Sequence, residues 1–219
     1  MVFLEWIEWL DGFLWVTKNN FLYFRYNSSQ NIKALIIEDK FELVKKKSSL
    51  EINEKELMDF YGYSGSIGKF QLKIRLLKSW ILHSIAYSSP HPGLTLSMQK
   101  ARGIIIGKNC HISPYVQLDW LYPNQITIGD NVAIGSNTMI FAHINIGNNE
   151  FFKNEKYPRR VMPVNIKSGA WINPGSIITA GITIGENSIV SVGSVVASDV
   201  PDYCIVAVNP ARVVKQIDH

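Results

Sequence analysis

The sequence predicts a mainly β fold, a parallel β-helix of six-residue repeats preceded by a mixed α/β N-terminal region. Two observations carry this prediction. An aliphatic residue recurs at every sixth position from about residue 106 to 196, and a small or β-branched residue usually stands four places after it. A period of six fits neither an α-helix nor a simple alternating strand. It fits a stack of coils in which each unit is a short strand and a corner, so that neighbouring coils satisfy each other's backbone hydrogen bonds.

The repeat has thirteen anchor positions, and all of them are Ile, Leu or Val. With three units to a coil, they predict a little over four coils with the anchors pointing into a narrow core. The anchors are Ile106, Ile112, Leu118, Ile128, Ile134, Ile140, Ile146, Ile166, Ile172, Ile178, Ile184, Val190 and Val196. The small residues four places on, which are expected where the chain bends, are Cys110, Val116, Val132, Thr138, Ala170, Ser176, Ser188 and Ser194.

Two interruptions change the phase of the repeat. The first adds four residues between Leu118 and Ile128, near the segment DWLYPNQ, and the second inserts a loop at 147–164. Long loops on a regular scaffold usually serve function rather than folding. The second interruption is therefore the first place to look for a site.

Residues 1–103 lack the repeat and predict a separate helical and mixed region. Residues 2–16 combine several Trp and Phe residues with three acids, which favours an amphipathic helix with a broad apolar face. Short strands are expected at 21–26, 34–39 and 41–44.

A polar stretch at 45–55 is expected to separate these strands from a second, basic helix at about 69–87. Two prolines and a glycine in 88–93 end that helix. The predicted β-helix domain then occupies residues 104–219, including the inserted loop and a C-terminal tail.

Composition limits the classes of protein that need to be considered. Apolar residues make up 47% of the chain and charged residues only 18%, which suits a folded protein that hides surface in an oligomer. The net charge is +4, and residues 1–103 hold the excess, with 14 basic against 10 acidic side chains. That excess is too small to indicate a nucleic-acid partner.

The cellular setting is expected to be the cytoplasm. Cys110 and Cys204 form no CxxC pair and suggest no disulfide framework. No signal peptide is apparent, and residues 2–16 are too short and too acidic for a membrane span. This segment is expected to pack against the β-helix or a neighbouring subunit; the alternative is peripheral contact with a membrane, which its aromatic residues suit and its acids oppose.

The repeat, the position of the loop, the Trp that follows it, GSVV at 193–196 and NPAR at 209–212 occur in an order that resembles the hexapeptide-repeat acyltransferases. The likeness covers about residues 104–217 and is closest to the sugar O-acetyltransferases, including those that modify surface polysaccharides. It implies a left-handed parallel β-helix, a homotrimer and acetyl-CoA bound in clefts between subunits. Left-handed crossovers oppose the usual preference, so the handedness comes from the resemblance alone.

His143 stands where this family carries its catalytic histidine, at the entry to the loop. An alcohol is a weak nucleophile at neutral pH, and a neutral imidazole can take its proton as the hydroxyl attacks the thioester. The resemblance implies direct attack without an acyl-enzyme. The alternative is a histidine that only caps a corner of the coil.

Three further residues are candidates for binding the acceptor. Trp171 matches the aromatic residue that lines the acceptor pocket in the family, where a planar ring can stack on a sugar. Asp119 and Gln117 lie one coil before His143 and are candidates to orient its imidazole or to hold the acceptor.

The resemblance also indicates residues for the co-substrate. In the family, certain backbone positions face the pantetheine arm of CoA, and they match Ala180, Gly181, Val192 and Gly193. Basic residues of the family's tail meet the CoA phosphates, and they match Arg212 and Lys215. Cations are suited to a ligand with several phosphates. Basic residues in the loop, Lys153, Lys156, Arg159 and Arg160, are either further phosphate contacts or a solvated surface.

The chain departs from the family pattern at three places. Ala197-Ser198-Asp199 lacks an expected cation, and Val208 replaces a Gly before the Asn-Pro pair. Asn173-Pro174 follows the Trp, and Pro174 has no N–H with which to stabilise a thioester oxyanion.

These observations predict acetyl-CoA-dependent O-acetylation of a carbohydrate or glycan. The resemblance implies that the reaction belongs to polysaccharide biosynthesis. The alternatives are N-acetylation of an amino or nucleotide sugar and a catalytically silent scaffold, which the departures favour. A zinc enzyme on this fold needs three converging histidines, whereas the repeat offers only His111 and His143, so no metal site is expected.

Overall fold

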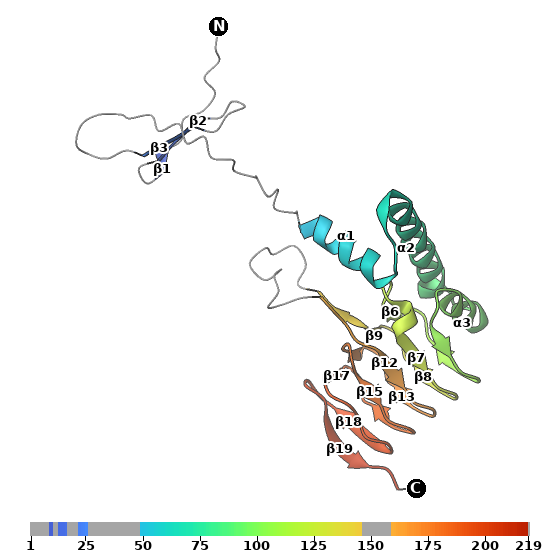
Figure 1. The fold of residues 1–219 in the computed structure, drawn as a ribbon. Helices are drawn as coiled ribbons and strands as arrows, with labels where there is room; N and C mark the ends of the chain where they lie inside the picture. Colours follow the sequence, from blue (N-terminus) through green and yellow to red (C-terminus); the bar gives the residue numbers. More distant parts are fainter. Residues whose placement is uncertain (1–8, 11–12, 17–21, 26–48, 146–158, 219) are drawn as a thin grey trace. The chain divides into compact units, whose positions relative to one another are not determined.

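The computed structural model describes residues 9–10, 13–16, 22–25, 49–145 and 159–218 (Figure 1). The chain forms two compact units, residues 1–46 and 47–219. The predicted boundary at residue 103 is not tested by this division and stays a prediction.

The first unit contains strands where the sequence suggested a helix. β1 (Trp9–Leu10) pairs with β2 (Phe13–Val16), and β2 pairs with β3 (Leu22–Arg25), both antiparallel. The expected helix at 2–16 is therefore wrong over β1 and β2. Aromatic and β-branched residues favour strands, and the Asp-Gly dipeptide between Leu10 and its partner Phe13 is a strong hairpin signal. The strand expected at 21–26 is confirmed by β3, whereas those at 34–39 and 41–44 lie outside the described residues.

Three helices open the second unit: α1 (Ser49–Phe60), α2 (Gly65–Ser88) and α3 (Pro92–Ala101). The helix expected at 69–87 is confirmed as the larger part of α2. The polar composition of 45–55 concealed α1, which is stabilised by two buried residues of its last turns, Leu57 and Met58. At the predicted break, His91 caps α3 by accepting a hydrogen bond from the Leu94 N–H at 3.2 Å.

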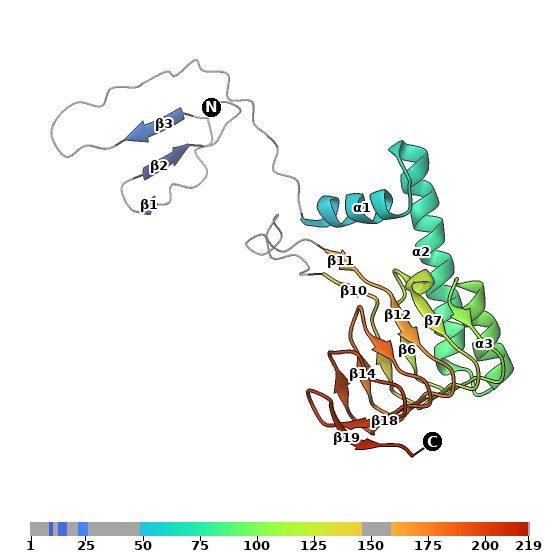
Figure 2. The same ribbon diagram turned by 60° about the horizontal axis from the view of Figure 1, so that its bottom comes forward.

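The repeat forms a parallel β-helix with three sheets, as the sequence predicted (Figure 2). Each coil supplies one strand to each sheet. The first sheet is β4 (Ile105–Ile106), β7 (Ile126–Ile128), β12 (Val164–Ile166) and β15 (Thr183–Ile184). The second begins with β5 (His111–Ile112), β8 (Ala133–Ile134), β13 (Trp171–Ile172) and β16 (Ile189–Val190). The third is β6 (Gln117–Leu118), β9 (Met139–Ile140), β14 (Ile177–Ile178) and β17 (Val195–Val196).

The anchors form the core because parallel pairing stacks them in register. In the first sheet, each anchor pairs with the anchor of the next strand: Ile106 with Ile128, Ile128 with Ile166, and Ile166 with Ile184. All twelve described anchors are buried, as predicted, and so are the small residues four places further on. Ile146 lies outside the described part of the chain.

The corners of the coils require a backbone that few residues adopt. Asn109, Asn131, Gly169 and Asn187 stand at equivalent corners between the first and second sheets, and each has a positive φ. Gly and Asn enter this left-handed region at the lowest cost. The polar corner residues are therefore part of the folding signal, and not only spacers between anchors.

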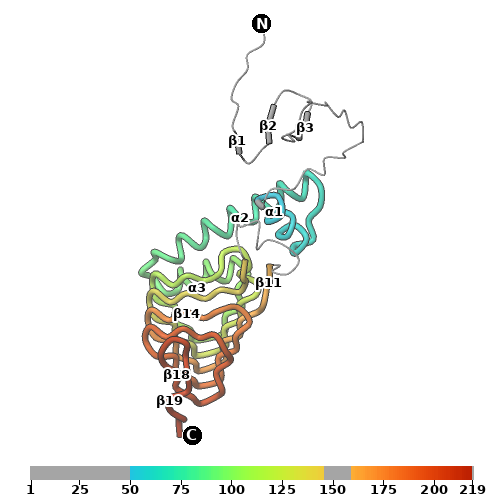
Figure 3. The backbone as a smooth tube through the Cα atoms, turned by 90° about the vertical axis from the view of Figure 1, so that its left-hand side faces the viewer, coloured from blue at the N-terminus to red at the C-terminus, as the bar shows by residue number. Residues whose placement is uncertain are grey.

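The chain ends on the second sheet. β18 (Cys204–Ala207) pairs in parallel with β16, and β19 (Arg212–Gln216) returns antiparallel to β18. At the other end of the stack, α3 covers β4 and β5 of the first coil and α2 packs on α3 (Figure 3). No helix among the described residues is long and apolar enough to cross a membrane.

Both interruptions lie between the third and first sheets, and we call this position the third corner. The first holds Asp119 and the short 3-10 helix Pro123–Gln125. The second begins at β10 (His143–Ile144), which pairs antiparallel with β11 (Arg160–Val161). Residues 146–158 between them are not among those described.

Candidate functional site

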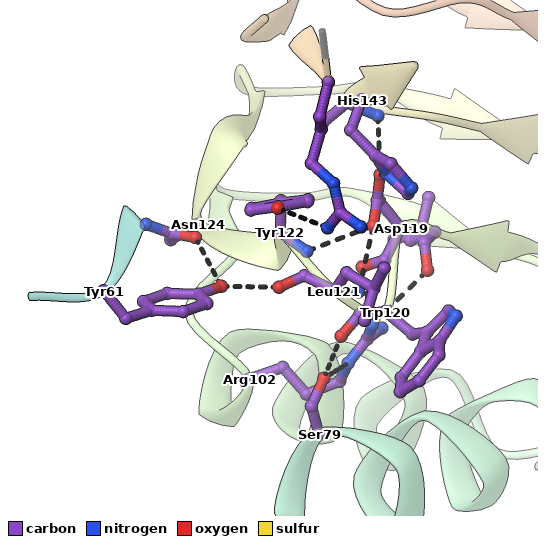
Figure 4. Close-up of polar contacts among 12 residues, drawn as sticks. Tyr61, Ser79, Arg102, Asp119, Trp120, Leu121, Tyr122, Asn124 and His143 are labelled. Carbon is purple, nitrogen blue, oxygen red and sulfur yellow. Dashed lines mark hydrogen bonds and ion pairs between the residues drawn. The ribbon is translucent and has the colours of Figure 1, made fainter. Parts of the chain in front are cut away.

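His143 and Asp119 meet at the third corner, although 24 residues separate them in the sequence (Figure 4). Asp119 follows the last strand of the first coil, and His143 follows the last strand of the second. The two corners stack, which brings His143 Nδ1 to 2.5 Å from Asp119 Oδ2. The repeat thus places a histidine and a carboxylate side by side.

Four hydrogen bonds hold the Asp119 carboxylate. Its Oδ1 accepts from the N–H groups of Leu121 and Tyr122, at 2.9 and 3.1 Å, and its Oδ2 accepts from the Ala142 N–H at 2.9 Å in addition to His143. Burial alone would raise the pKa of Asp119. The hydrogen bond and charge of His143 and the backbone donors outweigh burial and leave this pKa below its ordinary value. Asp119 is therefore a carboxylate at neutral pH.

The ionised carboxylate determines which nitrogen of His143 carries the proton. A carboxylate can only accept, so Nδ1 donates to Asp119. In the neutral ring, Nε2 then has its lone pair free to accept a proton. The His143 side chain is 17% exposed, whereas that of Asp119 has no exposed surface. This arrangement can supply a general base from a fixed direction.

Aromatic and charged residues pack around the pair. The Tyr122 ring lies 5.1 Å from the His143 ring and 6.1 Å from the Tyr61 ring, measured between centroids. The Tyr122 hydroxyl accepts a hydrogen bond from Arg159 at 2.8 Å, and burial raises its pKa. Arg159 also forms an ion pair with Glu56 of α1 at 3.0 Å. Of the basic loop residues, Arg159 is thus engaged within the chain and is not simply solvated.

Arg102 holds the backbone of the third corner from the side of the helical cap. This residue is only 6% exposed, and its guanidinium donates to the carbonyl oxygens of Leu118 and Asp119, at 3.3 and 2.7 Å. It also binds Ser79 of α2 at 3.3 Å. Burial lowers the pKa of Arg102 to about 10, which still leaves it protonated at neutral pH. Arg102 therefore connects the helical cap to the backbone of Asp119.

Ala180 and Gly181 are the predicted co-substrate residues that lie near this pair. They occupy the third corner between β14 and β15. A side chain added at Gly181 would meet Met162 at 3.3 Å, and the Met162 N–H donates to the Ala142 carbonyl at 2.9 Å. The side chain of Met162 therefore separates Gly181 from the backbone segment that carries His143.

The other predicted residues lie on different parts of the chain. Trp171 is half exposed on the second sheet. Val192 and Gly193 form the corner between β16 and β17, which joins the second and third sheets. Arg212 and Lys215 are on β19, which extends the second sheet. Gln117 is on β6, where it lines a pocket with His83, Ser84 and Tyr87 of α2. A single chain therefore brings together His143, Asp119, Ala180 and Gly181 at the third corner. The remaining predicted residues lie on the second sheet, at the corner between the second and third sheets, or on β6.

The departure at Asn173-Pro174 has a structural explanation. Pro174 packs directly against Gly135 of the preceding coil. A Cβ on Gly135 would come within 2.6 Å of Pro174, so the proline fits only because the residue stacked against it is glycine. The Asn173 side chain donates to the Val190 carbonyl at 2.9 Å. Both residues complete the stacking of the corner between the second and third sheets.

Sequence reasoning missed Tyr122, Arg102 and α1. Tyr122 lies within the first interruption, so the change of phase was a signal for it. Arg102 had no local signal, because its partners come from distant segments. Among the described residues, no group of three or more His, Cys, Asp or Glu side chains is arranged to hold a metal ion.

The comparisons with known proteins agree with this architecture. Residues 125–149 match the family model described as the hexapeptide repeat of succinyl-transferase. The chain is 30% identical to YvoF of Bacillus subtilis, a protein assigned to the acetyltransferases, over 142 residues that cover 64% of this chain and 77% of that protein.

Two further matches are with galactoside acetyltransferases. The chain is 36% identical over 94 residues to the galactoside O-acetyltransferase of Escherichia coli, which covers 42% of this chain and spans 45% of that protein's length. A solved structure of a galactoside acetyltransferase in complex with coenzyme A has a TM-score of 0.52 at 25% identity, covering 67% of this chain and 82% of that one. With the repeat, the three sheets and the match to YvoF together, the chain belongs to the hexapeptide-repeat acetyltransferase family.

Proposed function

We propose that this protein is an acetyl-CoA-dependent O-acetyltransferase that acts on a carbohydrate or glycan, with His143 as the general base. The observation that carries the proposal is the His143–Asp119 pair at 2.5 Å. It leaves the Nε2 lone pair on the side of the ring away from the carboxylate, where the proposal places the acceptor hydroxyl. Asp119, which was expected to orient the imidazole or hold the acceptor, takes the orienting role in this proposal.

The proposed reaction is one direct transfer. Nε2 of His143 accepts the proton of the acceptor hydroxyl while its oxygen forms a bond to the thioester carbonyl carbon. The carbon–sulfur bond then breaks, and the imidazolium returns the proton to the departing sulfur. The products are an acetyl ester and free CoA thiol. Asp119 stabilises the imidazolium that forms in between, because its low pKa keeps it negative.

We also propose that two copies complete each site in a homotrimer of left-handed β-helices. His143 and Gly181 lie at the third corner, whereas Trp171, Gly193 and Arg212 belong to the second sheet or its far corner. A neighbouring subunit that presents its second sheet to the third corner would join the two groups. Arg212 and Lys215 are exposed on β19, as residues that meet phosphates from outside must be.

The acceptor and the setting belong to the same proposal. The galactoside O-acetyltransferase of Escherichia coli is named for a sugar, which supports a carbohydrate acceptor. A setting in cytoplasmic polysaccharide biosynthesis stays a prediction from the sequence. An amino sugar would use the same base, since an ammonium group must also lose a proton before it can attack. The measurement of the acetylated product distinguishes an ester from an amide.

The test follows the release of CoA thiol from acetyl-CoA with a panel of sugars, amino sugars and oligosaccharides. His143→Ala should lower the rate by about 10² to 10⁴. Asp119→Asn should lower it by on the order of 10², because an amide can donate to Nδ1 and so place the proton on Nε2. Lys100→Gln, which removes an exposed charge from α3 and leaves all three sheets unchanged, should retain the rate of the unmodified protein.

Undiminished turnover in folded His143→Ala protein would rule out this mechanism. Failure of the unmodified chain to bind CoA in calorimetry would instead favour a silent scaffold. Circular dichroism of each variant separates a lost base from a lost fold.

A further inference from the structure

The outward face of α2 carries a continuous apolar stripe. Its residues recur at intervals of three or four and so lie on one side of the helix. The opposite side of α2 is buried and includes Leu72, Ser79 and Ala86. The stripe consists of Ile67, Phe70, Ile74, Leu77, Ile81 and Ile85, which are between 41% and 76% exposed. A contiguous exposed apolar patch of this kind marks a contact with another surface.

Cations flank the stripe on both sides. α2 has Lys69, Lys73, Arg75 and Lys78 and no Asp or Glu. At 100° per residue, Lys73 falls on one side of the stripe and Lys78 on the other. Neither lysine forms an ion pair with any residue of the part described, whereas Lys69 pairs with Glu54 at 2.9 Å. Trp80, which is 56% exposed, lies beside Lys73 on the same flank.

The place of α2 in the fold leaves this face open. α2 lies at the end of the stack, where it packs on α3 (Figure 3). It also reaches the first coil through Ser79, whose hydroxyl donates to the Trp120 carbonyl at 2.7 Å. Since Ser79 and the other buried residues of α2 face these partners, the stripe on the opposite side faces away from them. A 24-residue helix is about 36 Å long, and the stripe runs along most of it. The stripe is therefore a straight apolar ridge on the helical cap.

The charges decide among the surfaces that could cover this ridge. Pairing with α2 of a second copy would bring two rows of cations together without an acid in either helix, and coiled-coil pairing depends on complementary charges at those positions. Three carboxylates of the neighbouring α1 already have cationic partners within the chain. Glu54 pairs with Lys69, Glu56 with Arg159 and Asp59 with Lys55. An apolar ridge with lysines on both flanks and an aromatic residue at its edge matches the interface of an anionic bilayer.

We propose that α2 docks the protein on an anionic phospholipid surface, with the stripe in the headgroup boundary and Lys73 and Lys78 on the lipid phosphates. This surface differs from residues 2–16, the segment whose sequence suggested membrane contact. The inference does not depend on the proposed reaction. On this proposal the protein is a peripheral membrane protein, because α2 lies along the lipid surface and does not cross the bilayer.

Sedimentation of the full chain with vesicles tests the proposal. Phosphatidylcholine vesicles containing phosphatidylglycerol should carry the protein down, and phosphatidylcholine alone should bind it more weakly. Lys73→Gln and Lys78→Gln should each weaken binding about fivefold. The double variant Ile74→Gln/Leu77→Gln should weaken it at least tenfold, because two side chains no longer enter the boundary.

Matched controls use residues outside the ridge. Leu50→Gln changes an exposed leucine of α1 that is 68% exposed, and Lys167→Gln changes an exposed lysine on the third coil. Both should bind as the unmodified protein does. Circular dichroism checks the helix content of every variant, and thiol release checks the reaction separately.

Three results would overturn the proposal. Equal sedimentation of the stripe variant and the unmodified chain would assign any membrane contact to another segment, including residues 2–16. Absence of sedimentation would remove the lipid surface altogether. A smaller molecular mass of Ile74→Gln/Leu77→Gln in light scattering, with unchanged vesicle binding, would identify a second copy as the occupant.

Discussion

At the scale of single residues, the position of His143 in the repeat was readable from the sequence, but its surroundings were not. The resemblance identified the histidine, and the count of coils placed Asp119 near it. The hydrogen bonds from Leu121, Tyr122 and Ala142 that keep the carboxylate ionised come from the backbone of two coils. Backbone donors leave no signature in residue types, which is why sequence reasoning could not supply them.

Val208 is the residue where the local sequence and the backbone disagree most. It stands where the family has Gly, and its φ is +75°. A β-branched residue is strained in this region. Val208→Gly should stabilise the fold by about 1 kcal/mol, since the side chain is exposed and little packing is lost.

The measurement is thermal unfolding, in which this change should raise the Tm by about 3 °C. Val214→Gly is the matched control, because Val214 is similarly exposed and is not among the residues with positive φ. This control should lower the Tm. An equal fall in both variants would show that Val208 is not strained.

At the scale of elements, contacts between elements explain where two of the sequence-based predictions failed. The helix expected at 2–16 is replaced by the pairing of β1 with β2 and β3, because pairing partners outweigh a helical pattern in a short segment. α1 was missed for the converse reason, since its sequence is polar and its stability comes from the side chains it buries against the rest of the fold.

The helical cap is connected to the site through Arg102. Arg102→Lys keeps a charge but loses the fork that donates to the carbonyls of Leu118 and Asp119. The Asp119 backbone should shift, and the kcat of thiol release should fall about ten- to a hundredfold with the KM for acetyl-CoA nearly unchanged.

Lys100→Gln is the control, since Lys100 lies in the last turn of α3, two residues before Arg102, and is exposed. It should leave kcat and KM unaltered. A rise in KM without a fall in kcat for Arg102→Lys would show that Arg102 does not act through the catalytic pair.

At the scale of the whole molecule, the cap gives the fold a characteristic response to acid. Burial first, and the charge of Arg102 second, lower the pKa of His83 to about 4 from its ordinary value of 6.5. Between these values the unfolded chain binds a proton that the folded chain does not. Stability should therefore fall as the pH falls from 6.5 toward 4.

Thermal unfolding across this range checks the effect of His83. In His83→Gln, an amide oxygen can still accept from Arg102 but cannot be protonated, so the loss of Tm with acid should be smaller. Identical slopes for the two proteins would exclude His83 as a source of the acid response.

The sequence by itself determined the β-helix and its core, because the period of six requires a buried aliphatic residue at every anchor and a tight bend at every corner. The motifs around the repeat, and not the period, indicated the family. The sequence also marked both interruptions, since any insertion changes the phase. The tertiary structure alone decided that Arg102 and α1 support the corner where the interruptions lie and that α2 leaves an apolar ridge uncovered. These features depend on contacts between segments distant in the chain, and periodicity carries no information about which distant segments meet.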